Sequence, residues 1–169
     1  MKLRQLFLLL AIATGGAHAA KGHVHGAGSL DVRIDKGRIS LALALPLDAS
    51  TGFEHAPKTP QERAALENAG KILNDATSLF IPSPAAQCAL KVATVALPFA
   101  AEKKEAANIE HADIEASYTF ECANAAELKA IDTTLFKHFK RLYRLETQRV
   151  GPSGQGASRL TPKQPALRW

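Results

Sequence analysis

Residues Gly28 to Leu47 read GSLDVRIDKGRISLALALPL, and this stretch decides the fold. In its first run, Gly28 to Asp35, every second residue from Leu30 onward is apolar. The second run, Arg38 to Leu47, shows the same alternation, which is typical of a strand with one buried face. Only Lys36-Gly37 separates the two runs. The stretch therefore predicts an antiparallel β-hairpin.

A long helix is predicted after the loop DASTGFEHAPKTP. Thr59 suits the N-cap, Pro60 suits the first helical position, and Glu62 completes a capping box. Apolar residues then recur at helical spacing as far as Phe80, and Pro82 stops the pattern. We therefore expect one helix from Pro60 to about Phe80.

The rest of the chain is predicted to form mainly strands. The expected elements are strands at Cys88–Phe99, Asp113–Cys122, Leu128–Thr133 and Tyr143–Val150, a short helix at Thr134–Leu142, a turn at GPSGQG and an edge strand in ASRLTPKQPALRW. Helices and strands do not alternate regularly, so the expected fold class is α+β with a mainly antiparallel sheet, one long helix and a short second helix.

The first residues, MKLRQLFLLLAIATGGAHA, have the three parts of a secretory signal peptide. A basic start is followed by an apolar run from Leu6 to Ala13 and by small residues at Ala17 and Ala19. No later stretch approaches the ~20 apolar residues that a membrane-spanning helix needs. We therefore expect a signal peptide at residues 1–19 and a single exported domain at 20–169, without a membrane span.

Two cysteines, Cys88 and Cys122, are the whole cysteine content of the chain. An even number in an exported protein favours one disulfide, which would stabilise the fold by roughly 3–4 kcal/mol in the chain-entropy model. The alternative is that both are thiolate metal ligands, but neither belongs to a Cys-x-x-Cys pair. With a disulfide, any metal must be held by histidine and carboxylate groups.

Candidate metal ligands lie in three separate places: His23 and His25 before the first strand, Glu54 and His55 in the loop after the hairpin, and His111 and Asp113 around the start of a later strand. In extended backbone, His23 and His25 point to the same side. Imidazole nitrogen together with carboxylate oxygen is a ligand set that zinc accepts. Each place also has an ordinary interpretation: solvated chain, a loop histidine bonded to backbone, and a surface ion pair.

Copper is an alternative metal. If the leader were removed one residue later, the mature chain would begin Lys21-Gly22-His23. A free amine, two amides and an imidazole would then form a square-planar nitrogen set, which Cu(II) prefers.

Four stretches together resemble the zinc-regulated periplasmic proteins typified by ZrgA: GHVHGAGSLDV, GFEHAPKTPQE, HADIEASYTFEC and LFKHFKRLYRLETQRVGPSGQGASRLTPKQPAL. The resemblance covers essentially the whole mature chain. It implies a periplasmic zinc-binding protein that assists zinc uptake alongside a zinc ABC importer. The positions that match the family motifs are His23, His25, Glu54, His55, His111 and Asp113.

The chain departs from the family pattern just before HAD. Relatives carry a long tract of His, Asp and Glu there, whereas this chain has AEKKEAANIEH with a single histidine. The departure argues against high-capacity zinc storage. Any zinc would then be bound at sites formed by the folded domain.

The expected function is non-enzymatic zinc binding for zinc acquisition or homeostasis. A zinc-dependent hydrolase with Glu54 as general base is one alternative, but no His-Glu-x-x-His or Ser-centred motif is present. A metal-free envelope scaffold or partner-binding module is another. The formal net charge of +5 is modest for 169 residues, and no nucleic-acid partner is expected.

Overall fold

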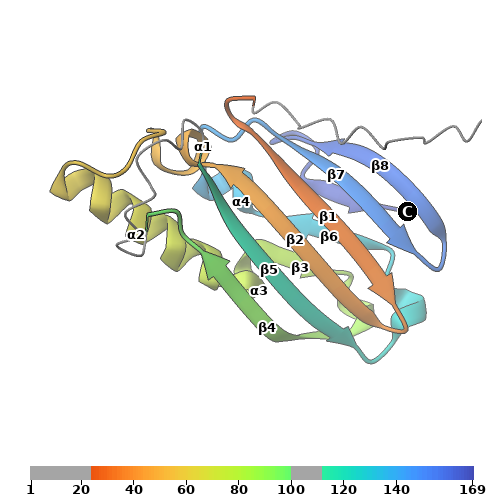
Figure 1. The fold of residues 1–169 in the computed structure, drawn as a ribbon. Helices are drawn as coiled ribbons and strands as arrows, with labels where there is room; N and C mark the ends of the chain where they lie inside the picture. Colours follow the sequence, from red (N-terminus) through yellow and green to blue (C-terminus); the bar gives the residue numbers. More distant parts are fainter. Residues whose placement is uncertain (1–23, 100–111) are drawn as a thin grey trace, which may run out of the picture.

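The computed structural model describes residues 24–99 and 112–169, so the predicted signal peptide lies outside the described residues. Six strands form the main sheet in the order β4-β5-β2-β1-β7-β8 (Figure 1). Their bounds are β1 Ala27–Asp35, β2 Arg38–Pro46, β4 Cys88–Ala96, β5 Asp113–Cys122, β7 Arg144–Gly151 and β8 Gly154–Leu160. Only β1 and β7 pair in parallel, and the other neighbours are antiparallel. The predicted α+β class with a mainly antiparallel sheet is confirmed.

The predicted hairpin forms the two central strands, β1 and β2. Asp35 pairs with Arg38 across the turn, and both turn residues, Lys36 and Gly37, have positive φ, at 46° and 84°. Such a turn matches the twist of the two strands and sets their register. Apolar side chains on alternate positions of β1, such as Leu30, are therefore buried together on one face.

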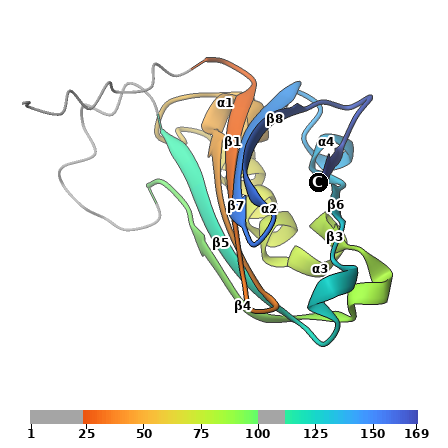
Figure 2. The ribbon, with the colours of Figure 1, turned by 90° about the vertical axis from the view of Figure 1, so that its right-hand side faces the viewer.

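A second layer covers the buried face of the main sheet (Figure 2). It contains helices α2 Pro60–Asn74, α3 Ala76–Leu79 and α4 Leu135–His138, with 3-10 turns η1 Pro84–Ala86 and η3 Ala125–Glu127. A small sheet of order β3-β6-β9, with bounds Phe80–Pro82, Ala130–Thr133 and Ala166–Arg168, completes the layer. Helix α1, Leu47–Thr51, follows β2 directly at one end of the main sheet.

Helix α2 begins as predicted but ends earlier than predicted. Thr59 caps it, with its hydroxyl accepting from the Glu62 N–H and the Glu62 carboxylate accepting from the Thr59 N–H. The expected helix to about Phe80 is interrupted once: Asp75 leaves the helical conformation at φ −87° and ψ 62°, and a second short helix, α3, then covers Ala76–Leu79. Phe80 instead begins β3, where its buried ring lies 5.2 Å from the ring of Tyr118. The apolar pattern up to Phe80 thus contributes buried side chains from three elements, α2, α3 and β3, to one core.

The disulfide between Cys88 and Cys122 is present, as predicted. The two residues stand directly opposite each other in the antiparallel pair β4–β5. The bridge therefore fastens the edge strand β4 to its neighbour, and neither sulfur is a free thiolate metal ligand.

The buried interior also holds one phenol. The Tyr118 hydroxyl donates to the Leu73 carbonyl at 2.8 Å, which joins β5 to the last turn of α2. Burial raises the pKa of Tyr118 well above its ordinary value.

Candidate metal centre

His25 stands in a tight turn just before β1. The Ala27 N–H donates to the Val24 carbonyl at 3.0 Å, and Gly26 adopts φ +67°. The Gly26 carbonyl accepts the Tyr143 N–H at 3.0 Å, which continues the parallel pairing of β1 with β7. A Cβ at Gly26 would lie 2.6 Å from the Arg141 carbonyl oxygen. Only glycine fits this close contact. The contact therefore fixes the position of His25, the residue before Gly26, relative to β1 and β7.

Asp48 lies in the first turn of α1, immediately after the end of β2. The Leu47 N–H donates to the Ala112 carbonyl at 2.9 Å, and the Asp48 carbonyl accepts from Arg141 Nε at 3.0 Å. These bonds fix the backbone of α1 between the start of β5 and the segment before β7. The Asp48 side chain is 9% exposed, and its Oδ1 has no hydrogen-bond partner among the described residues.

Glu54 reaches the same place from the loop between α1 and α2. Its Oε1 lies 2.9 Å from His25 Nδ1, and Asp48 Oδ2 lies 3.5 Å from that nitrogen. One ligand atom from each of the three side chains lies within 4.8 Å of the others. The exposed fraction rises from 9% for Asp48 through 32% for Glu54 to 70% for His25. The His25–Asp48–Glu54 group is therefore buried on one side and open on the other.

The donor set of the His25–Asp48–Glu54 group suits a divalent cation such as zinc. One imidazole nitrogen and two carboxylate oxygens are ligands that zinc accepts, and three protein ligands leave a further position in a tetrahedral shell. A buried carboxylate oxygen without a donor is costly, and a cation would compensate it. The copper alternative of the sequence analysis uses Lys21, Gly22 and His23, which lie outside the described residues.

Comparison with known families agrees with this chemistry. The family model described as "ZrgA family zinc uptake protein" matches residues 22–169. The chain belongs to the ZrgA family. No match was found among curated proteins. The family supports a zinc-related role, and the predicted resemblance is confirmed.

The ZrgA-family positions predicted as ligands are only partly brought together. His25 and Glu54 meet, and Asp48, which the sequence analysis did not select, joins them. Asp113 begins β5 opposite Pro46 and is not a member of the group. His23 and His111 lie outside the described residues.

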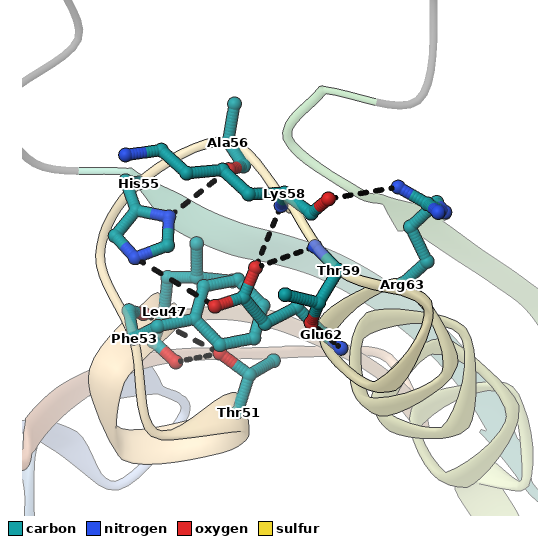
Figure 3. Close-up of polar contacts among 9 residues, drawn as sticks. All are labelled: Leu47, Thr51, Phe53, His55, Ala56, Lys58, Thr59, Glu62 and Arg63. Atoms are coloured by element: carbon teal, nitrogen blue, oxygen red, sulfur yellow. Dashed lines mark hydrogen bonds and ion pairs between the residues drawn. The ribbon is translucent and has the colours of Figure 1, made fainter.

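His55 of this ZrgA-family chain is not a member of the His25–Asp48–Glu54 group. Its ring stacks on Phe53 with centroids 5.5 Å apart, and its Nε2 lies 3.8 Å from Glu62 Oε1 (Figure 3). The main-chain N–H groups of Lys58 and Thr59 donate to the Glu62 carboxylate and hold its pKa below the ordinary value, with a smaller contribution from His55. His55 thus faces the start of α2 rather than the His25–Asp48–Glu54 group.

Within the described residues, none of the helices has both the length and the apolar character needed to cross a membrane.

Proposed function

We propose that this protein binds a zinc ion as cargo at the His25–Asp48–Glu54 group and contributes to zinc acquisition in the periplasm. The observation that supports the proposal most strongly is the buried Asp48 carboxylate. One of its oxygens has no donor within the described residues, while the other faces an imidazole that a second carboxylate also contacts. The contacts within the described residues therefore leave negative charge of the two carboxylates uncompensated, and a bound cation would compensate it.

Two further histidines are proposed to complete the coordination. His23 precedes His25 by two residues in the same HVHG motif. His111 precedes Asp113 by two residues, and Asp113 begins β5 opposite Pro46 at the end of β2. His23 and His111 lie outside the described ranges, and their part in the site remains a prediction.

The proposed role is not enzymatic. A hydrolytic zinc site needs a free general base beside its open position, and Glu54 is the base that the sequence offers. In the structure its carboxylate is engaged with His25 at 2.9 Å. Binding and release of cargo require only that the ligands exchange, which the exposed side of the group allows.

The proposed location and partner follow from the leader, the disulfide and the family. A disulfide between Cys88 and Cys122 fits the oxidising periplasm. The proposed recipient of the zinc is a zinc ABC importer or its binding protein. Export is tested by the N-terminus of protein recovered from the periplasm, which we expect at Ala20.

Asp48→Asn tests the zinc site. The amide keeps the size of the side chain but is a poor zinc ligand, so zinc affinity should fall by at least about 100-fold, because losing even an outer-shell partner costs 10- to 100-fold. The measurement is a chelator-competition titration on protein without a His-tag. In the wild type, zinc at 100 times Kd should add about 2.7 kcal/mol of stability, and this gain should vanish in the variant.

Asp31→Asn is the matched control, because Asp31 is an exposed carboxylate in the middle of β1. It should bind zinc like the wild type. The proposal is wrong if Asp48→Asn also binds like the wild type, or if the wild type takes up no zinc.

A further inference from the structure

The loop between α1 and α2 carries two consecutive side chains that have different partners. The Glu54 carboxylate contacts His25 at 2.9 Å. The His55 ring lies on Phe53 and faces Glu62 (Figure 3). Because the two residues are adjacent in the chain, contacts that hold His55 also restrict the backbone that carries Glu54.

Both ends of this loop are fastened. At the start, the Thr51 hydroxyl donates to the Leu47 carbonyl at 2.7 Å and lies 3.4 Å from the Phe53 carbonyl oxygen. At the end, the Glu62 carboxylate accepts the N–H groups of Lys58 and Thr59 at 2.6 and 3.0 Å. Between these anchors, no main-chain hydrogen bond holds Glu54 or His55 within residues 24–99 and 112–169. Side-chain contacts must hold the middle of the loop.

The His55 ring makes those contacts through its stack on Phe53, through a hydrogen bond of Nδ1 and through the nearby Glu62 carboxylate. Nδ1 lies 3.0 Å from the Ala56 carbonyl oxygen, which can only accept, so Nδ1 carries the hydrogen. Nε2 faces the Glu62 carboxylate at 3.8 Å. To bind a zinc ion beside His25, this ring would have to leave Phe53, Ala56 and Glu62 together.

We propose that His55 is a positioning residue for the zinc site and not one of its ligands. By stacking on Phe53 and bridging to the capping box of α2 through Glu62, it holds the loop so that Glu54 faces His25. This inference rests on the proposed zinc site. It assigns the Glu-His pair of the loop two separate tasks: Glu54 binds the ion, and His55 sets the direction of Glu54.

His55→Ala and His55→Gln test the proposal, with His138→Ala as the control because His138 is an exposed histidine on α4. Zinc affinity is measured by chelator competition, and the visible spectrum of the Co(II)-loaded protein reports the ligand atoms. A lost stacking contact should weaken zinc binding by about threefold to tenfold. We expect that loss in His55→Ala, a smaller loss in His55→Gln, and an unchanged Co(II) spectrum in both.

Glu62→Gln tests the contact between His55 and Glu62 by changing Glu62. The control is Glu67→Gln, because Glu67 is an exposed glutamate on the same helix. Glu62→Gln should weaken zinc binding less than His55→Ala does, because the stack of His55 on Phe53 remains. Combined with His55→Ala, it should add little, because His55→Ala already removes the contact between His55 and Glu62. Circular dichroism and Tm of the metal-free proteins show whether each variant is folded.

Two results would overturn the inference. A loss of about 100-fold or more in His55→Ala with a changed Co(II) spectrum would make His55 a ligand. Unchanged affinity in both His55 variants would show that the loop holds Glu54 without it. Because wild type and Asp48→Asn are titrated in parallel, failure of the zinc site itself is recognised separately, as absence of binding in the wild type.

Discussion

Gly26→Ala should damage both the fold and the zinc site, because it alters the turn that carries His25. An alanine at φ +67° costs about 1–2 kcal/mol of backbone strain. Its Cβ would also lie 2.6 Å from the Arg141 carbonyl oxygen and 2.5 Å from Tyr143 Cε1. Relieving these contacts requires a backbone shift between β1 and β7, which adds about 1–3 kcal/mol.

The total of about 2–5 kcal/mol corresponds to a Tm lower by about 5–15 °C for a chain of this size. Differential scanning calorimetry of the metal-free protein measures this shift, and a chelator-competition titration measures zinc affinity, which should also fall as His25 moves.

Gly154→Ala separates strain from crowding. Gly154 also has positive φ, at +92°, but a Cβ there meets nothing within 4 Å. Only the backbone strain of about 1–2 kcal/mol remains, and zinc affinity should not change. If the two variants lose the same stability and both bind zinc normally, the contact between Gly26 and the Arg141–Tyr143 segment does not position His25.

Two further predictions concern the fold. Reduction of the Cys88–Cys122 bridge, which closes a separation of 34 residues, should lower the free energy of unfolding by about 4 kcal/mol, as measured in urea with and without reductant; equal midpoints would contradict this. Burial raises the pKa of Tyr118 above its unfolded value of 10.0, so its neutral phenol stabilises the fold below about pH 10 and this contribution is lost as the pH rises further. Tyr118→Phe should therefore lose about 1–2 kcal/mol at neutral pH, with its bond to the Leu73 carbonyl, and show a shallower alkaline decline in Tm; an unchanged alkaline profile would refute the assignment.

The main elements of the fold could be predicted because their patterns are local. Strand alternation located β5 at its observed bounds, Asp113–Cys122, and the capping box located the start of α2 at Pro60. The end of α2 could not be located in this way. Residues up to Phe80 keep a helical apolar spacing, yet α2 ends at Asn74, α3 covers Ala76–Leu79 and Phe80 begins β3, so apolar spacing alone does not show where a helix is interrupted.

The candidate site was predicted only in part, because its ligands converge through long-range contacts. His25 and Glu54 stood out as a histidine of a His-x-His pair and a carboxylate beside a histidine. Asp48 had no such signal, since an acidic residue at the start of a loop is ordinary. His55 had the signal, but the stack on Phe53 and the neighbouring Glu62 turn its ring toward α2.

The hairpin register brings His25 and Asp48 to the same end of the main sheet but does not by itself identify Asp48. A two-residue turn at Lys36-Gly37 pairs Asp35 with Arg38, and the pairing of the two strands ends at Ser29 and Ala44. Beyond that pair, Asp48 lies in helix α1 and His25 lies in the turn closed by Val24 and Ala27, so neither residue continues the ladder. These two local elements bring Asp48 Oδ2 to 3.5 Å from His25 Nδ1. Because a one-residue change in the Lys36-Gly37 turn would shift β1 against β2, it should also separate the two side chains. Glu54 joins them from a loop whose direction depends on its contacts with α1 and α2.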